Sequence, residues 1–473
     1  MFSKKTHFDC VILGGGPAGC VLAYTLADWG KSVCLIEKGR SPHPFPMQTI
    51  AADAKAVFKR NGIMTSMREA GHLRPNKRIL VWGDGTPESI TFSDNECGMR
   101  VDRELLDPDL RNLARARKVT VLVDAKVTTP LPEYGSGTVT VVQDGSACEI
   151  EADVFVVASG KTHDANLLPL ALEHVSPALF ALTATIHCKK KHKEIDVLEA
   201  IENGWLSWFT GSEIGPQFAL FTNTPTQECR EVIRMAGRLL QRSLSGDFAF
   251  ERGTVRYTNA TPRLVSTTNG ALLIGDASCT IDPLLGRGIE SSVLSAESAA
   301  VCVNTIIEKP GLRLECRQHL VTLEKARYFE NLSTALGLYL REPRYSDMPF
   351  WLDRHSLCDV DFSSPNDLEL PMKLQVASEV GRFPTLQRSG KLLERVIGMG
   401  KPGGPVHQTT LGIPVSELLD LVSENHWTDD VLTLANHHQH LYVHSKAKLT
   451  RALSELYRLG IIESATDSNK PSS

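Results

Sequence analysis

A glycine-rich loop, GGGPAG at residues 14–19, follows a short apolar segment near the N-terminus. In such a loop Gly14 permits a tight turn out of a strand, Gly16 lets the backbone approach a pyrophosphate, and Gly19 lets a helix pack closely on the strand. The N–H groups at the start of that helix then face the phosphates. Glu37 ends the next apolar segment, where an acidic residue accepts hydrogen bonds from a ribose diol. These residues predict a dinucleotide site, whose contacts also include Pro17, Ala18 and Lys38.

The segments around this loop have the pattern of a strand, a helix and a second strand. Residues 9–13 and 32–36 are short apolar runs typical of strands buried on both faces, and residues 21–29 have helical spacing. A unit of this kind belongs to an α/β fold with a parallel sheet. The sequence therefore predicts a Rossmann-like domain at the N-terminus.

A second motif lies far downstream. Residues 273–277 (LIGDA) are an apolar run ending in Gly-Asp, residues 282–289 read DPLLGRGI, and residues 290–302 have the composition of a helix. The pair resembles the late GD…DPxxGxG motif of FAD monooxygenases and halogenases with the p-hydroxybenzoate hydroxylase fold. The resemblance implies that FAD is the cofactor and that Asp276 binds its ribityl chain. It also implies that a turn lies beside the flavin pyrimidine ring, where a helix N-terminus stabilises negative charge; the residues of this turn are Pro283, Gly286, Gly288 and Ile289.

Three shorter segments agree with this family. Residues 101–103 (VDR) resemble its DR motif, which implies that Arg103 lies near the cofactor. Residues 153–160 (DVFVVASG) resemble the strand that returns to the dinucleotide fold. Residues 46–52 lie where tryptophan halogenases and their relatives carry a loop against the flavin, so Gln48 and Thr49 are expected contacts, although the Gly-Glu pair of that loop is missing here.

Two segments indicate the branch of the family. Residues 204–209 (GWLSWF) resemble a GWxW segment that faces the substrate cavity, and residues 339–354 resemble a tyrosine, acidic-Arg and Pro-Phe-Trp segment. We expect Trp205 and Trp208 to share one face of a strand and to line the cavity or stack on an aromatic substrate, with simple core packing as the alternative. Glu290 is a weak candidate for a catalytic base, or else a surface residue.

The resemblance extends to flavoproteins that mature tryptophylquinone cofactors, in particular the monooxygenases of quinohemoprotein amine dehydrogenase biogenesis. It implies hydroxylation of a tryptophan within a protein or peptide, through a flavin C4a-hydroperoxide formed with O2. The electrons would come from NAD(P)H or from a separate flavin reductase.

Three other activities stay open. A halogenase shares the cofactor motifs, but Lys77 is the only lysine near the strand where halogenases carry theirs, and Phe-Thr-Gly follows Trp208 in place of Ile-Pro. A reductase of the geranylgeranyl-reductase type shares the fold. A flavin-binding regulator would use a C-terminal module to bind DNA.

The bulk composition excludes several classes. The chain has 473 residues, 42% hydrophobic and 22% charged, with a formal net charge of −4, which does not favour a nucleic-acid partner. No apolar stretch is long enough to span a membrane, and residues 1–9 lack the regions of a signal peptide. We therefore expect a cytoplasmic protein whose cysteines, such as Cys10, Cys20 and Cys34, are reduced and structural. Histidines at 437, 438, 440 and 444 have no Cys, Asp or Glu to complete a set, so no metal site is expected.

The chain divides into three expected parts. Residues 1–355 form the FAD-binding domain, with an interleaved substrate sheet at about 75–100 and 165–265. Residues 356–404 are rich in Pro and Gly near their end and form a connecting segment. Residues 405–473 form a small helical module similar to a winged helix, with helices at 415–422, 428–437 and 445–459. This module docks a protein substrate or partner, or supports the structure.

Overall fold

A computed structural model describes most of the chain and divides it into two compact units, Met1–Val360 and Asp361–Ser473. The described residues are 6–39, 47–50, 54–69, 77–91, 99–161, 166–188, 196–209, 217–223, 248–250, 256–267, 270–359, 370–371, 373–402, 406–410, 413–424, 428 and 446–465.

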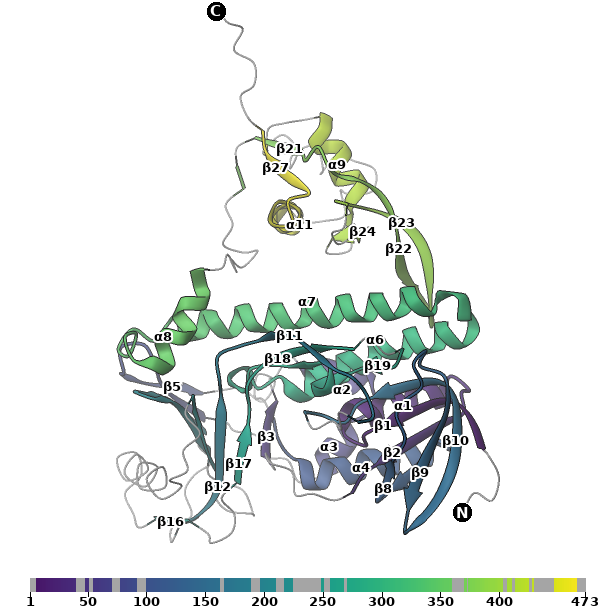
Figure 1. The fold of residues 1–473 in the computed structure, drawn as a ribbon. Coiled ribbons are helices and arrows are strands. Elements are labelled where there is room, and N and C mark those ends of the chain that lie inside the picture. The colour runs from purple at the N-terminus through teal and green to yellow at the C-terminus, as the bar shows by residue number, and fades with distance from the viewer. Residues whose placement is uncertain are drawn as a thin grey trace, which may run out of the picture. The chain divides into compact units, whose positions relative to one another are not determined.

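The first unit is built on a seven-stranded sheet of order β7-β2-β1-β10-β9-β8, with β19 paired to β10 (Figure 1). Strands β7, β2, β1, β10 and β19 are parallel, whereas β9 and β8 continue as an antiparallel meander. Their bounds are β1 Thr6–Leu13, β2 Val33–Glu37, β7 Thr120–Val123, β8 Ala125–Val127, β9 Gly137–Gln143, β10 Ser146–Val157 and β19 Leu272–Leu273. The predicted Rossmann-like fold is confirmed, because α1 connects the parallel strands β1 and β2. Strands β1 and β10 end together, with Leu13 opposite Val157.

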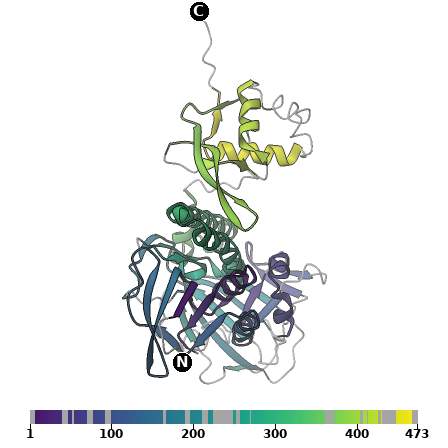
Figure 2. The same ribbon diagram turned by 90° about the vertical axis from the view of Figure 1, so that its right-hand side faces the viewer.

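Helices cover this sheet and carry the cofactor motifs. Helix α1 (Pro17–Asp28) contacts β1, β2, α4 (Arg103–Ala116) and α6 (Gly288–Glu308). Helices α2 (Ala54–Arg60) and α3 (Met64–Glu69) follow the short strand β3 (Met47–Ile50), which pairs with β6 (Met99–Asp102). The end-on view of the sheet shows α1 and α4 beside its strands (Figure 2). The two predicted flavin motifs thus begin helices that touch each other, α1 and α6.

A second, eight-stranded sheet is assembled from distant parts of the chain in the order β16-β12-β15-β14-β13-β4-β5, with β17 paired to β12. Its strands are β4 Lys77–Val81, β5 Pro87–Thr91, β12 Phe180–Cys188, β13 Asp196–Ile201, β14 Gly204–Phe209, β15 Gln217–Thr222, β16 Phe248–Phe250 and β17 Arg256–Asn259. Strand β4 runs parallel to β13, and the Arg78 Nη2 atom lies 2.7 Å from Oδ2 of the buried Asp196 across that pair. An ion pair therefore fixes the place of the β4–β5 hairpin at the sheet edge.

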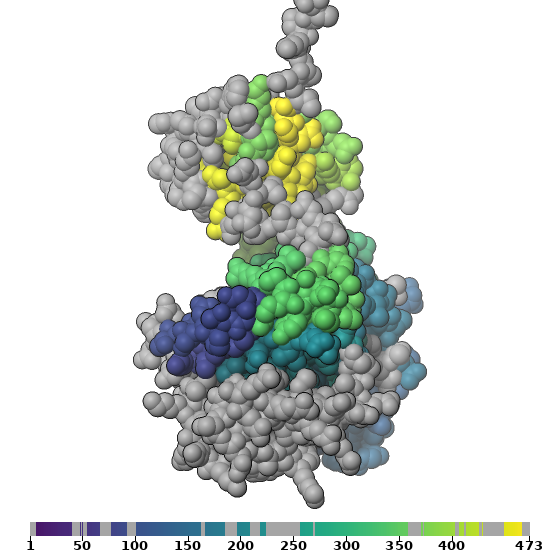
Figure 3. Space-filling view, turned by 90° about the vertical axis from the view of Figure 1, so that its left-hand side faces the viewer, coloured from purple at the N-terminus to yellow at the C-terminus, as the bar shows by residue number. Residues whose placement is uncertain are grey.

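Helix α7 (Arg313–Tyr339) has a buried stripe with a spacing close to four residues, made of Leu320, Glu324, Tyr328, Leu332, Leu336 and Tyr339. The stripe packs on a three-stranded sheet of β11 (Ala171–Val175), β18 (Arg263–Ser266) and β20 (Cys279–Thr280). Helix α8 (Pro349–His355) follows. On the face drawn in Figure 3 the β4–β5 hairpin lies against the segment after α7. Trp82 of this hairpin donates its indole N–H to the Leu338 carbonyl oxygen at 3.0 Å.

The second unit has a core of its own around helices α9 (Val415–Glu424) and α11 (Lys446–Arg458). Its strands are β21 Leu374–Val376, β22 Gly381–Ser389, β23 Leu392–Gly400, β24 Val406–His407, β25 Thr409–Thr410, β26 Ile413–Pro414 and β27 Ile462–Ser464. Leu449, Leu453 and Leu456, which lie on one side of α11, are fully buried. Most of the helix expected at 428–437, and the four histidines near it, lie outside the described residues.

The expectation of an irregular connection at 356–404 is wrong for its second half, where β22 and β23 form a long antiparallel hairpin. Gly398, within the predicted connecting segment, lies in β23, and a Cβ atom there would stand 2.9 Å from the His407 carbonyl carbon. The glycine permits the close approach of β24 to the hairpin. Composition alone does not separate this use of glycine from a flexible linker.

Among the described residues, no helix is both long and apolar enough to cross a membrane.

Candidate functional site

The glycine loop makes two backbone contacts that leave no space for side chains. Gly14 has a φ of +113°, and a Cβ atom on it would lie 2.3 Å from the Ala158 carbonyl oxygen at the end of β10. A Cβ atom on Gly19 would lie 2.0 Å from the Gly14 carbonyl oxygen. The loop is therefore held tightly between β1, β10 and α1, as the strand–turn–helix pattern requires.

The outer side of the loop is open. Gly16 is the N-cap of α1 and makes no side-chain cap, and Pro17 occupies the first turn. Among the described residues, a Cβ atom on Gly16 would meet only the Arg103 Nη2 atom, at 3.7 Å. The first turn of α1 thus begins beside a guanidinium group, and among the described residues no other side chain crowds Gly16, which fits the pyrophosphate of FAD.

Glu37 lies at the end of β2 and reaches back to the loop. Its Oε2 atom accepts a hydrogen bond from the Gly15 N–H at 2.5 Å, while the Gly15 carbonyl oxygen accepts one from Arg111 Nη1 at 3.1 Å. This places the carboxylate beside the loop, where we expect it to bind the adenosine ribose. Lys38 is exposed directly after the strand.

Arg103 is the first residue of α4, with Asp102 as its N-cap. Its Nε and Nη2 atoms bind the two Asp107 carboxylate oxygens at 2.8 and 2.9 Å. Its third nitrogen, Nη1, donates to Gln48 Oε1 at 3.2 Å. The structure therefore joins two predicted cofactor residues, Arg103 and Gln48, next to the glycine loop, whereas only the backbone of Thr49 is described.

Asp276 lies in a short 3-10 helix, Gly275–Ala277, directly after β19. Gly275 packs on α1, since a Cβ atom on it would stand 3.0 Å from the Ala18 Cβ atom. Burial raises the pKa of Asp276, and the positive charges of Lys161, Arg103 and Arg263 act in the opposite direction. The two flavin motifs thus meet at Ala18 and Gly275, and the Asp276 carboxylate lies within reach of three cations.

Lys161 follows β10 and lies near the carboxylates of Asp276 and Asp282, which belong to the downstream flavin motif. Its Nζ atom donates to the Asn259 carbonyl oxygen at 3.2 Å, and its own carbonyl oxygen accepts from Arg263 Nη2 at 2.5 Å. Burial lowers the pKa of Lys161, which the two carboxylates oppose. Lys161 and Arg263 thus place positive charge beside the expected ribityl site.

The DPLLGRG turn is stabilised by its own first residue. Asp282 caps the 3-10 helix Pro283–Leu285 by accepting the Leu284 N–H at 2.9 Å. Gly286 then takes a left-handed conformation with a φ of +63°, and α6 begins at Gly288 without a side-chain cap. An open helix N-terminus at this point fits the predicted contact with the flavin pyrimidine ring.

The next two residues of α6 point to different surroundings. Ile289 is buried, whereas Glu290 has its Oε2 atom 3.9 Å from Arg287 Nε. The role of Glu290 as a base stays a prediction.

The expectation that Trp205 and Trp208 share one face of a strand is wrong. Both lie on β14, but residues three apart on a strand point to opposite faces. Trp205 is 2% exposed and stacks on Phe221 at 3.8 Å between ring centroids, within an aromatic core cluster that does not include Trp208. Trp208 is 1% exposed. Both tryptophans are therefore packed in the interior of the structure described here.

Several residues of the site were not predicted from the sequence. Arg111 lies two helical turns after Arg103 on α4, and this spacing was a usable signal. Lys161 follows the small-residue end of a predicted strand, which was a weaker signal. The hydrogen bond between Tyr339 and Asp282 had no local signal, because it joins residues far apart in the chain.

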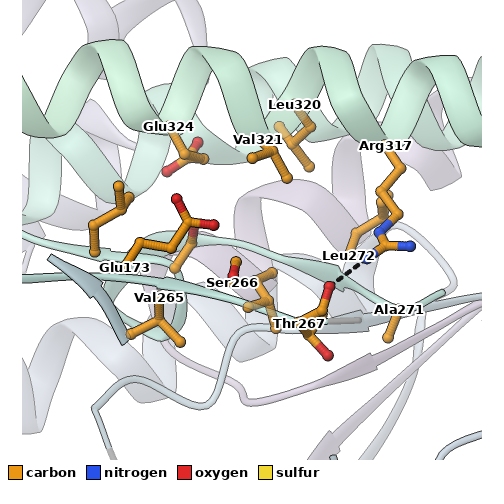
Figure 4. Close-up of a pocket in the computed structure, with 13 residues that line it drawn as sticks. Glu173, Val265, Ser266, Thr267, Ala271, Leu272, Arg317, Leu320, Val321 and Glu324 are labelled. Carbon is orange, nitrogen blue, oxygen red and sulfur yellow. Dashed lines mark hydrogen bonds between the residues drawn. The ribbon is translucent and has the colours of Figure 1, made fainter. Parts of the chain in front are cut away.

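A buried polar chain supports the Asp276 turn from behind. The Gly275 N–H donates to Ser295 Oγ at 2.9 Å, and Ser295 Oγ donates to Glu324 Oε1 at 2.8 Å. Arg327 forms an ion pair with the same carboxylate. Glu324 is 2% exposed and lines a pocket below α7 (Figure 4). The figure shows Glu324 and Arg317 projecting from α7 over the strand residues Val265 to Thr267.

Changing Glu324 to Gln is expected to lower the free energy of unfolding by about 2 kcal/mol, because the half-buried Arg327 loses its charged partner. Urea unfolding followed by circular dichroism measures the change. Glu330→Gln, at an exposed position of the same helix, is the control and is expected to change little. Equal effects of the two substitutions would show that the Glu324 pair adds no stability.

Fold and site together define a flavoprotein: a Rossmann-like domain with an open pyrophosphate loop, and a second motif that carries an acidic residue and an uncapped helix. Residues 7–169 match the family model of the FAD binding domain. The protein is an FAD-dependent oxidoreductase.

Relatives by sequence and by structure differ in their activities. The chain is 27% identical over 327 residues to a digeranylgeranylglycerophospholipid reductase of Methanoculleus marisnigri, covering 63% of this chain and 78% of the relative. The enzyme of that name from Methanocella arvoryzae is 22% identical, and the match covers 84% of this chain and 100% of the relative.

Two solved structures share the fold over nearly the whole chain. The peptidyl tryptophan dihydroxylase QhpG of tryptophylquinone cofactor biogenesis has a TM-score of 0.69 at 17% identity, covering 96% of this chain and 99% of its own. The flavin-dependent halogenase CmlS has a TM-score of 0.73 at 17% identity, covering 98% of this chain and 96% of its own.

Proposed function

We propose that this protein is an FAD-dependent monooxygenase that hydroxylates an aromatic ring, and that its substrate is a tryptophan within a protein or peptide. The proposal is supported by the similarity to QhpG over 96% of this chain, which includes most of the C-terminal unit as well as the flavin domain. CmlS shares the fold equally well, and the Phe-Thr-Gly sequence after Trp208, in place of Ile-Pro, favours the hydroxylase over a halogenase. The C-terminal unit has its own core, as a module that binds a macromolecular substrate requires. Bound FAD, once reduced, would supply activated oxygen from O2.

The residues of the site divide the work of holding the cofactor. The glycine loop and Arg103 bind the pyrophosphate, Glu37 binds the adenosine ribose, and Asp276 binds the ribityl chain. The N-terminus of α6 would lie beside the pyrimidine ring and stabilise negative charge there. Lys161 and Arg263 keep the surroundings of Asp276 positive. The electrons come from NAD(P)H or from a separate flavin reductase.

Oxygen transfer needs a site from which water is excluded. Near the turn at Asp282, the second sheet, α7 and α8 provide an aromatic core of Trp205, Phe221, Tyr339, Phe350 and Trp351. Because these side chains are packed against one another, they form the dry wall of the site, and the substrate ring lies beyond them.

Reduction of an isoprenoid double bond is the second candidate function. It is favoured by the sequence relatives, which are digeranylgeranylglycerophospholipid reductases of 21% to 27% identity. Such a reaction adds two hydrogens and consumes no O2, so the two proposals differ in product and in co-substrate.

The test uses the full-length holoprotein, reduced without air and then mixed with isotopically labelled O2 and a tryptophan-containing peptide, with chloride or bromide present. Mass spectrometry is expected to show labelled oxygen in the peptide. Halogen in the product would support a halogenase instead. A parallel sample without O2 receives a geranylgeranyl lipid. Addition of hydrogen to that lipid, with only peroxide formed in the peptide samples, would overturn the monooxygenase proposal.

A further inference from the structure

Tyr339 is the last residue of α7, and its hydroxyl group lies between two buried polar partners. The Trp205 Nε1 atom lies 3.1 Å from the Tyr339 oxygen, which in turn lies 3.2 and 3.1 Å from Oδ1 and Oδ2 of Asp282. An indole N–H only donates and a carboxylate only accepts, so the direction of both bonds is fixed. The phenol accepts from Trp205 and donates to Asp282.

Asp282 determines the shape of the turn expected to face the flavin. One of its oxygens caps the 3-10 helix at Leu284, and this helix leads through the left-handed Gly286 to the start of α6. Asp282 is 6% exposed. Burial raises the pKa of Asp282, whereas the Leu284 N–H, Arg354, the Tyr339 hydroxyl and Lys161 stabilise its charged form. A change at Tyr339 therefore acts on the group that holds this turn in place.

The other partner of Tyr339 belongs to the second sheet. Trp205 lies on β14 and stacks on Phe221 of β15. The Tyr339 ring itself packs edge-on against Phe350 and Trp351, with centroids 6.0 and 5.9 Å away, and the Arg354 guanidinium lies 5.1 Å from its centroid. Its position is thus fixed from several sides, and its hydroxyl is the polar link between β14 and the DPLLGRG turn.

We propose that Tyr339 is a positioning residue that holds the turn at residues 282–288 in its FAD-binding conformation and connects that turn to strand β14 of the second sheet. The proposal rests on the binding of FAD and not on the hydroxylation reaction. It can therefore be tested independently of which substrate the enzyme acts on.

The test is Tyr339→Phe, which removes the hydroxyl and keeps the ring. We expect the dissociation constant of FAD to rise about tenfold, because a buried carboxylate and a buried indole each lose a hydrogen bond. We also expect a changed visible circular dichroism spectrum of the bound flavin, which reports its geometry. Fluorescence titration of the cofactor-free protein with FAD gives the affinity without any turnover.

Tyr328→Phe is a matched control on the same helix. Tyr328 is also buried, and its hydroxyl binds His174 Nδ1 at 2.7 Å and Ser176 Oγ at 2.9 Å, neither of which belongs to a flavin motif. This variant is expected to lose similar thermal stability and to keep the wild-type FAD affinity and spectrum. If both variants weaken FAD binding equally, or if Tyr339→Phe binds FAD as the wild type does, the proposal is wrong.

A double-mutant cycle tests the link to β14. Trp205→Phe alone is expected to weaken FAD binding by a few-fold, since the phenol loses the donor that orients it. Combined with Tyr339→Phe it is expected to have no further effect, because the shared hydroxyl is already gone. Additive effects of the two substitutions on the dissociation constant would refute the connection.

Discussion

Replacing Gly19 by Ala is expected to abolish FAD binding. The new Cβ atom would lie 2.0 Å from the Gly14 carbonyl oxygen and 3.3 Å from the Ala158 side chain, so α1 has to move away from the glycine loop. The Gly14 backbone and the Ala158 Cβ atom leave little room for relaxation, and overpacking of this kind costs about 3 kcal/mol. Flavin content after purification and fluorescence titration measure the loss, which we expect to exceed about a hundredfold in dissociation constant.

Gly337→Ala is the control for this substitution. Gly337 also lies inside a helix, α7, but nothing described lies within 4 Å of the position of its Cβ atom. Alanine is expected to stabilise that helix by up to about 1 kcal/mol and to leave FAD binding unchanged. Full flavin occupancy in Gly19→Ala would mean that the glycine loop is not the pyrophosphate site.

Replacing Asp276 by Asn is expected to weaken FAD binding by about ten- to a hundredfold, because a hydrogen bond to a charged group is lost. The same substitution is expected to stabilise the cofactor-free protein at neutral pH. Burial raises the pKa of this carboxyl, and among the described residues no hydrogen bond reaches its oxygens. In the absence of FAD the three nearby cations thus only partly offset the cost of burying its charge.

The stability of the cofactor-free protein depends on pH through the Asp276 carboxyl. A raised pKa in the folded state means that the stability contributed by Asp276 is fully present below the ordinary carboxyl pKa of about 4 and is lost as pH rises through the raised value. Asparagine does not ionise. The free energy of unfolding of cofactor-free Asp276→Asn, measured with urea, should therefore fall less over that pH range than that of the wild type. Asp347→Asn, at an exposed position, serves as the control. An unchanged FAD affinity in Asp276→Asn would exclude the ribityl contact.

Local patterns were enough to predict the first part of the site. The strand, glycine loop, helix and second strand all lie within residues 6–37, and their periodicity depends on neighbouring residues alone. The downstream motif was also found at the correct elements, with Gly275 and Asp276 after β19 and Gly288 at the start of α6. Turns of this kind need particular residue types, and they can therefore be predicted from the sequence.

Long-range contacts were not predictable in this way. The bond between Tyr339 and Asp282 and the chain from Gly275 through Ser295 to Glu324 depend on how α6, α7 and β14 pack. No short pattern signals such pairs, because each partner alone is an ordinary buried polar residue. The error on Trp205 was different, since an odd spacing on a strand already places two side chains on opposite faces.

The interleaving of the two large sheets has a consequence for how the chain reaches its native state. The seven-stranded sheet takes strands from residues 6–157 and then β19 at 272–273, while the eight-stranded sheet combines β4 and β5 with strands between 180 and 259. Several pairings in both sheets, among them β1 with β10 and β4 with β13, therefore close long loops, and a high contact order slows folding. During synthesis the flavin sheet stays incomplete until β19 has left the ribosome. A fragment ending before residue 272 is consequently expected to aggregate, since it exposes the edge of β10 that β19 covers.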